Sequence, residues 1–131
     1  MGLSVTRSGS EYQEFVGLYD IGATGAHTLN CGGAGITSVT RTAAGKYTIN
    51  VSPAVAPLGP LMHVELIHFP IANAGPKNLR PTQTAADTKP AANGTAGAVL
   101  YESWSVGTSP AQVELESGCQ VFIRLTYLKT K

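Results

Sequence analysis

Residues 35–52 read GITSVTRTAAGKYTINVS, and this stretch indicates the architecture of the chain. Its first half is rich in β-branched side chains, and its second half alternates Tyr47, Ile49 and Val51 with polar neighbours. A short link that ends at Gly45 joins the two halves, which is typical of a β-hairpin. The chain is therefore expected to fold through antiparallel strand pairs.

Alternation of apolar and polar residues recurs on both sides of this hairpin. Upstream, residues 14–21 place aromatic residues on one face, and downstream, residues 119–128 form a long alternating run. Residues 61–69 are apolar on both faces except for His and Glu, which is typical of a central strand with partners above and below. Further short strands are predicted over residues 26–30, 98–106 and 111–116. About seven or eight strands without a helical period predict an all-β fold, an antiparallel sandwich, a jelly-roll-like domain or a barrel.

The length of 131 residues predicts one domain. Residues 1–13 are polar and lack a clear period, so they are expected to form an N-terminal arm ahead of a β domain over residues 14–131. Within that domain, residues 70–97 contain four prolines and predict a long irregular loop. Cys31 and Cys119 are far apart in the chain, and both a disulfide and two free thiols are compatible with the sequence.

The composition limits the kinds of partner. Hydrophobic residues make up 43% of the chain and charged residues only 13%, against about 25% charged in an average globular domain. The net charge of +1 is spread without a basic run, which argues against nucleic-acid binding. No apolar stretch is long enough to predict a membrane span, and the N-terminus lacks the apolar segment of a secretory signal. A neutral surface of this kind is suited to contact with other proteins, because it is inexpensive to dehydrate.

The titratable residues do not assemble a recognisable active site. His63 and His68 are five apart in one predicted strand, so they point to opposite faces and cannot hold a metal together on that strand. Glu114 and Glu116 share one face of a predicted strand, and this pattern is expected of a face turned to solvent. We therefore predict no catalytic residue, no cofactor and no metal site, and expect a protein that is not an enzyme.

Two further features suggest structural roles. Asp20 and Glu65 stand among apolar neighbours, and each is expected to pair with Arg41 or Arg124. Trp104, the single tryptophan, is expected in the core or in a seam between subunits. A platform on which a carbohydrate stacks is the alternative for Trp104.

The hairpin and its surroundings resemble a known kind of protein. Residues 38–48, SVTRTAAGKYT, follow a Gly-rich turn, and a Leu-x-Ser-Gly step at residues 115–118 leads into the long last strand. The pattern over residues 15–128 resembles small structural proteins of tailed bacteriophages. These are in particular capsid decoration, or cement, proteins and some tail-fibre head domains.

The resemblance implies a function without catalysis. A cement protein is a homotrimer that binds the major capsid protein on the outer surface of an icosahedral head, after assembly in the host cytoplasm. The alternative is a tail-fibre or receptor-binding tip domain that recognises a host surface glycan or protein. The arm, the Pro-rich loop and the tryptophan are the segments expected to bind partners, and the residues chosen are Leu3, Val5, Arg7, Tyr12, Asn78, Leu79, Arg80 and Trp104.

Overall fold

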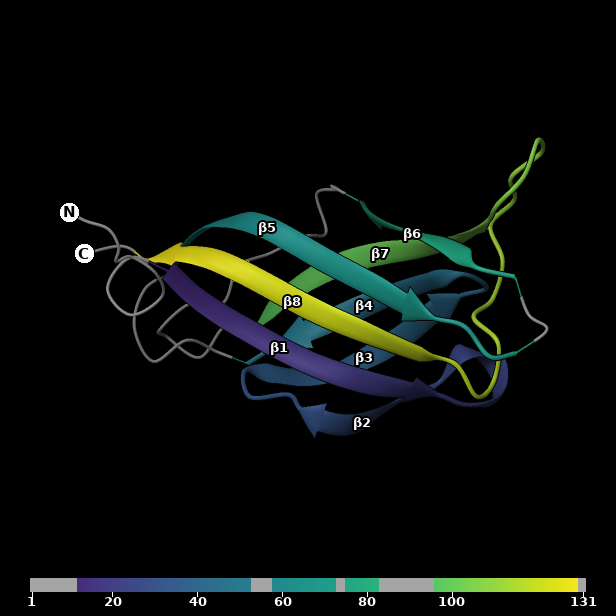
Figure 1. Ribbon diagram of the computed structural model, residues 1–131. Helices are drawn as coiled ribbons and strands as arrows, with labels where there is room; N and C mark the ends of the chain where they lie inside the picture. Colours follow the sequence, from purple (N-terminus) through teal and green to yellow (C-terminus); the bar gives the residue numbers. More distant parts are fainter. Residues whose placement is uncertain (1–11, 53–57, 73–74, 83–95, 130–131) are drawn as a thin grey trace.

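The computed structural model describes residues 12–52, 58–72, 75–82 and 96–129, and β-strands make up most of these residues (Figure 1). Two four-stranded antiparallel sheets pack face to face, which confirms the all-β prediction and selects the sandwich among its forms. The strands are β1 (Tyr12–Ile21), β2 (His27–Gly32), β3 (Ile36–Ala43), β4 (Lys46–Val51), β5 (Leu58–Phe69), β6 (Lys77–Thr82), β7 (Gly97–Ser105) and β8 (Gln120–Lys129).

The first sheet, called sheet A here, has the strand order β2-β1-β8-β5, and sheet B has the order β3-β4-β7-β6. In Figure 1 the strands of sheet A lie in front of those of sheet B. A short 3-10 turn, η2 (Ala23–Gly25), connects β1 to β2. The first and last strands of the chain are neighbours in sheet A, where Tyr12 pairs with Leu128.

The predicted hairpin is confirmed as the β3–β4 pair, in which Val39 faces Ile49 and Arg41 faces Tyr47. Gly45 closes its turn with a φ of 73°, a backbone conformation that glycine adopts without strain. A Cβ on Gly45 would also lie 2.7 Å from the carbonyl oxygen of Val113, so the turn accepts glycine for two independent reasons.

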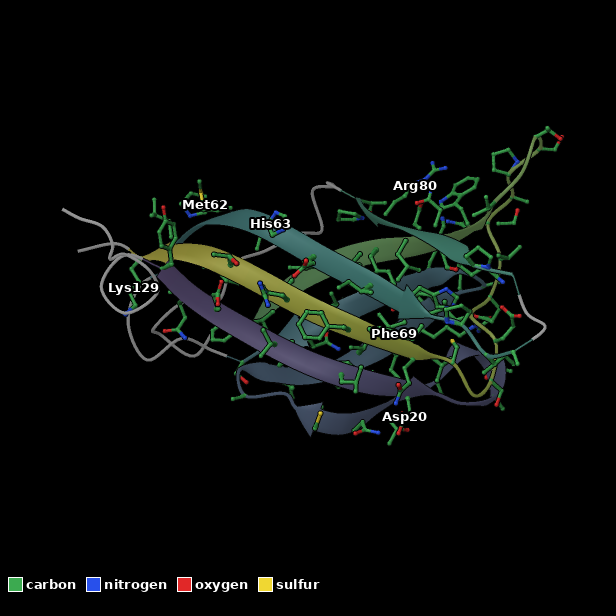
Figure 2. All side chains as sticks on the ribbon, in the orientation of Figure 1. Asp20, Met62, His63, Phe69, Arg80 and Lys129 are labelled. Carbon is green, nitrogen blue, oxygen red and sulfur yellow. The ribbon has the colours of Figure 1, made fainter. Side chains whose placement is uncertain are left out.

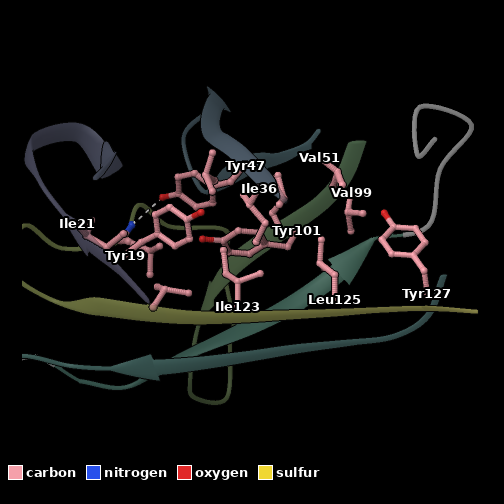
Figure 3. Packing of buried hydrophobic residues seen from close by; sticks show 14 of the residues in the cluster. Tyr19, Ile21, Ile36, Tyr47, Val51, Val99, Tyr101, Ile123, Leu125 and Tyr127 are labelled. Carbon is pink, nitrogen blue, oxygen red and sulfur yellow. Dashed lines mark hydrogen bonds between the residues drawn. The ribbon is translucent and has the colours of Figure 1, made fainter. Parts of the chain in front are cut away.

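Alternation along β8 fills the core, as its sequence predicts. From Val121 to Tyr127 every second residue of this strand is at most 1% exposed, whereas the residues between them are partly exposed. Tyrosines are the largest members of the core, with Tyr47 and Tyr101 packed together toward one end and Tyr127 toward the other (Figure 3). The buried residues of β8 are Val121, Ile123, Leu125 and Tyr127.

The expectation of a central strand over residues 61–69 is wrong. Among the described strands, β5 pairs only with β8 and is therefore an edge strand of sheet A. Its outward residues Ile67 and Phe69 are 39% and 46% exposed. The inward residues of β5 face the core, and its outward side combines Ile67 and Phe69 with the polar residues His63 and Glu65.

The segment 70–97 is not irregular throughout, since residues 77–82 form strand β6. The strand contains Pro81, which an edge strand tolerates because no neighbour requires its missing N–H. Residues 83–95, the rest of the predicted Pro-rich loop, lie outside the described residues. Residues 111–116, predicted as a strand, make only one isolated bridge, between Gln112 and Trp104.

The N-terminal boundary also differs from the expectation. Tyr12 and Gln13, predicted as the end of an arm, are the first residues of β1 and pair with β8. Residues 1–11, the rest of that arm, lie outside the described residues. Both thiols are free, with Cys31 exposed and Cys119 buried. No helix among the described residues is long and apolar enough to cross a membrane.

Candidate functional site

The outer face of sheet A carries an apolar surface. Even-numbered residues of β1 and β8 point away from the core, because their odd-numbered neighbours point into it. Val16 is 37% exposed at the middle of β1, and Phe69 at the end of β5 is 46% exposed. In Figure 2 Phe69 lies at the end of β5 in sheet A, and Arg80 lies beside β6 in sheet B. We call this surface the apolar face, and its members are Val16, Leu18, Cys31, Ile67, Phe69 and Phe122.

An open hollow of about 370 Å³ lies in the apolar face. Gly17 and Gly32, which are opposite each other in the β1–β2 pair, contribute only backbone to its wall. The remaining wall is formed by Val16, Leu18, Cys31, Phe69, Gln120 and Phe122. Since five of these six side chains are apolar or a thiol, the hollow is suited to apolar side chains of a partner.

The charged groups that flank the apolar face have partners within the chain. Asp20 accepts hydrogen bonds from Gln120 at 2.8 Å and from Asn30 at 3.0 and 3.1 Å, and these bonds lower the pKa of its carboxyl group. Glu65 pairs with Arg124 at 3.5 Å, and Arg124 is one of the two arginines predicted as its partner. The guanidinium of Arg124 also lies 5.6 Å from the ring centre of Phe122.

The outer face of sheet B carries a polar cluster around the tryptophan. The Cζ atom of Arg80 lies 4.6 Å from the ring centre of Trp104, and the indole N–H donates a hydrogen bond of 2.9 Å to Glu102. Asn78 is the register partner of Trp104, and Arg80 is the register partner of Glu102. These four residues are called the Trp104 cluster, and they hold the half-buried indole in one orientation.

The structure brings together three of the residues predicted to bind partners. Asn78, Arg80 and Trp104 meet in the Trp104 cluster, although Trp104 lies on an outer face and not in the core. Leu79 points the opposite way and packs against the core, since neighbouring residues of a strand face opposite sides. Tyr12 begins β1 and is half-buried. The predicted residues Leu3, Val5 and Arg7 lie outside the described residues.

A hydrogen-bond network of acid–base side chains lies at one end of the sandwich, and sequence reasoning missed it. The hydroxyl of Tyr47 donates to Glu114 at 2.6 Å and accepts from the backbone N–H of Leu115 at 3.0 Å. Arg41 binds the other oxygen of Glu114 at 2.7 Å. The expectation that Glu114 faces solvent is therefore wrong, because the segment turns its carboxylate toward Tyr47 instead of continuing as a strand.

Glu116 is likewise not a purely solvated residue, since it pairs with Lys77. Gly25, which has a φ of 75°, lies against the carboxylate of Glu114 and leaves room for it. A Cβ there would lie 2.5 Å from an oxygen of Glu114. No pattern in the sequence links these residues, because they come from separate turns and strands.

His27, from β2, joins the network by a ring contact, with its ring centre 4.8 Å from that of Tyr47. Its Nδ1 lies 2.8 Å from the carbonyl oxygen of Gly25, and its Nε2 lies 2.5 Å from the hydroxyl of Tyr101. A carbonyl can only accept, so Nδ1 carries the proton of the neutral ring and Nε2 accepts from Tyr101. Burial lowers the pKa of His27 to about 4, so the ring is neutral near pH 7.

The network is chemically suited to holding the sandwich together. Partial burial alone would raise the pKa of Glu114, but hydrogen bonds from Tyr47, Arg41 and the N–H of Gly45 outweigh it and lower that pKa. Burial raises the pKa of Tyr101 well above its ordinary value. The hydroxyls of Tyr47 and Tyr101 and the Nε–H of Arg41 meet acceptors within the chain, and neither His27 nor Glu114 lines the hollow in the apolar face.

The three histidines do not converge. His63 is exposed on the outer side of β5 and His68 faces the other side, as their spacing predicts, while His27 belongs to the network. Within the part of the chain that the structure describes, no three His, Cys, Asp or Glu side chains are grouped as a metal site would require. No family model matches the chain, and neither a curated protein nor a solved structure is significantly similar to it.

Proposed function

We propose that this protein is a structural component of a virion, a capsid cement or decoration protein that acts by surface contact. The observation that carries the proposal is the presence of two different contact surfaces on opposite faces of one sandwich, the apolar face and the Trp104 cluster. A protein that bridges neighbours needs two such surfaces. The capsid as the partner comes from the resemblance of the hairpin sequence to phage cement proteins, which also implies a homotrimer on the head surface.

In this proposal the Trp104 cluster contacts the major capsid protein. Tryptophan and arginine are the residue types that most often dominate the energy of a protein interface. The ring of Trp104 is held by Arg80 and by its hydrogen bond to Glu102, so little side-chain freedom remains to be lost on binding. The cluster lies on β6 and β7, whose backbones are fixed by six register pairs.

Binding to shells tests the proposal. Phage heads assembled without the protein are mixed with the purified chain and sedimented, and the chain is expected to sediment with them. Trp104→Ala is expected to weaken this binding by about 2 kcal/mol or more, roughly thirtyfold, as for a central interface tryptophan. Thr48→Ala, on the same outer face away from the cluster, is the matched control. A chain that stays in the supernatant at every concentration would overturn the proposal.

A receptor-binding tip domain is the second candidate, and the composition of the Trp104 cluster favours it specifically. An indole next to the side chains of Asn78, Arg80 and Glu102 combines an apolar ring with planar hydrogen-bonding groups, a combination suited to a sugar ring. Binding of the chain to host cells or immobilised glycans, lost in Trp104→Ala and without binding to shells, would favour this function over cement.

A further inference from the structure

The side of the sandwich that is bordered by β5 and β6 is incompletely covered (Figure 1). The inward residues of β8 are almost fully buried, whereas Leu61, Val64 and Leu66, the inward residues of the edge strand β5, are only half-buried. A hollow of about 360 Å³ lies beside them, and its wall is formed by residues 61–64 of β5, Pro81 and Thr82 of β6, and Val99 of β7. A strand added beside β5 would cover this hollow with its inward side chains.

Among the described strands, β5 is also the edge with the least protection. Natural edge strands resist the addition of another strand by being short or by carrying lysine, proline or bulges. β2 and β6 have six residues each, β6 also contains Lys77 and Pro81, and the pairing of β3 has two register shifts. β5 has 12 residues, its proline and its register shifts lie within the first six, and its one carboxylate, Glu65, pairs with Arg124. Along the rest of β5, every second residue directs its N–H and C=O to an edge that no described strand occupies.

The sequence of residues 1–6 fits this edge better than the other stretches outside the described residues. Residues 1–6 read MGLSVT and alternate large apolar residues with small ones, although the first 13 residues as a whole lack a period. Residues 83–95, which follow β6, contain no apolar side chain larger than alanine except one proline. Residues 53–57, which precede β5, read PAVAP, and prolines have no N–H to donate to a neighbouring strand. Residues 1–6 are therefore the stretch that supplies large apolar side chains at every second position.

The topology of sheet A brings the segment before β1 within reach of this edge. β1 and β5 are both antiparallel to β8, where Tyr12 pairs with Leu128 and Leu58 pairs with Lys129, so β1 and β5 begin at the same end of the sheet. A strand beside β5 would lie three strand spacings from β1, about 14 Å, which about five extended residues can span. Residues 7–11, RSGSE, have that length and are polar. A segment that leaves Tyr12 in this way and then follows β5 runs antiparallel to it.

We infer that residues 1–6 add to the open edge of β5 in the same chain, as a further antiparallel strand of sheet A. Six extended residues reach about 20 Å along β5, which is enough to cover the hollow. The side chains at positions 1, 3 and 5 enter the hollow beside Leu61 and Val64, and those at positions 2, 4 and 6 face outward. Leu3 and Val5 thus bind the chain's own sheet and close its open edge to strands of other molecules. The inference goes beyond the proposed function and does not depend on it.

Hydrogen exchange of the unmodified chain, followed by NMR, tests whether the edge is covered. The β5 amides that point away from β8 exchange rapidly at an open edge and slowly where a strand accepts their hydrogens. We expect these amides, and alternate amides of residues 1–6, to be protected. Nuclear Overhauser contacts are expected between the methyl groups of Leu3 or Val5 and those of Val64. In a mixture of isotope-labelled and unlabelled chains, these contacts should arise within one chain.

Two pairs of substitutions with the same added charge separate the two sides of the added strand. Leu3→Asp with Val5→Asp places two carboxylates on the side that faces the hollow, whereas Ser4→Asp with Thr6→Asp places them on the outward side. The first pair is expected to speed exchange of the open-edge amides at least about tenfold, because ionised carboxylates are costly to bury in an apolar hollow. The second pair is expected to leave that exchange unchanged. Where the first pair fails to fold, as judged by circular dichroism, the contacts in the unmodified chain decide.

Three results would overturn the inference. The first is rapid exchange of both the β5 edge and residues 1–6 in the unmodified chain. The second is a protected edge whose contacts come from residues 53–57, from residues 83–95 or from another chain. The third is an equal loss of protection in the two pairs of substitutions. None of these measurements uses phage shells, so their outcome is separate from that of the cement proposal.

Discussion

The two outer faces of the sandwich differ although the same alternation generates both. Sheet A turns large aliphatic and aromatic side chains outward among charged ones such as Glu65 and Arg124, whereas the outer face of sheet B is built mainly from short polar side chains. On sheet B, Asn50 donates hydrogen bonds to Ser38 at 2.9 Å and to Thr40 at 2.8 Å, so these polar groups are satisfied across the strands. The comparison teaches that the inward residues specify the fold, while the outward residues are free to specialise each face.

The largest expected effect is the pH dependence of stability that arises from His27 in the interior of the sandwich. Burial lowers the pKa of His27 to about 4, below the 6.5 of an unfolded histidine. The unfolded state therefore binds a proton first, and stability present above pH 6.5 is lost as the pH falls toward 4, by up to about 3 kcal/mol. Urea unfolding of His27→Phe across this range is expected to show a shallower loss than the unmodified chain.

His63→Gln, at an exposed position on β5, is the control for that measurement and should keep the full slope. Some slope is expected to remain in His27→Phe. Burial and the charge of Lys77 also lower the pKa of His68, which therefore contributes with the same sign. A His27→Phe variant with an unchanged slope would show that His27 does not couple protons to folding.

A smaller effect is expected when the network loses its carboxylate. Glu114→Ala leaves the Tyr47 hydroxyl without its acceptor and Arg41 without its ion pair, so unfolding free energy should fall by about 1–3 kcal/mol. Glu116→Ala removes a more exposed carboxylate that pairs with Lys77, and it should cost less than about 1 kcal/mol. Thermal and urea unfolding of both variants measures this difference, and equal losses would contradict the role of the network.

Salt is expected to weaken binding through the Trp104 cluster, which contains Arg80 and Glu102. Binding to shells should fall between about 0.05 M and about 0.5 M sodium chloride, because salt screens contacts between exposed charges. Sedimentation with shells measures this dependence, and binding that does not change with salt would contradict a charged contact.

The smallest expected effect is the loss of stability when the arginine beside an aromatic ring is removed from either face. Arg80 stacks on Trp104 and Arg124 lies farther from Phe122 but also pairs with Glu65. Each arginine-to-alanine variant should lose about 0.5–1 kcal/mol of unfolding free energy, as for exposed pairs of this kind. Urea unfolding compares them with Lys46→Ala on an exposed strand end, which is expected to change little. A loss of more than about 2 kcal/mol of unfolding free energy in either variant would mean that its face contributes more to folding than the exposure of these side chains implies.

Local patterns in the sequence were sufficient for the hairpin and for the inward and outward sides of β1 and β8. Those predictions depend on neighbours within a strand, where parity places each side chain. The pattern failed at β5, because an apolar outer face and a covering layer produce the same run of residues. It failed again at Lys77–Thr82, because prolines suggested a loop although an edge strand accepts Pro81.

The candidate surfaces were only partly predictable for the same reason. Asn78 and Arg80 were predicted from their place in the Pro-rich segment and Trp104 as the single tryptophan, but their meeting depends on the β6–β7 register, a long-range pairing. The apolar face was not predicted as a surface at all. Its members come from four strands that become neighbours only in the order β2-β1-β8-β5.

The sequence by itself determined that the chain is an all-β protein, with Tyr47, Ile49 and Val51 directed to one side and Thr48 and Asn50 to the other. A period of two residues is a local property, so it survives without knowledge of partners. Only the tertiary structure decided which strands are edges, and that Glu114 turns inward to Tyr47. Pairing partners are chosen by packing between segments far apart in the chain, and that choice is what gives the sandwich two unlike faces.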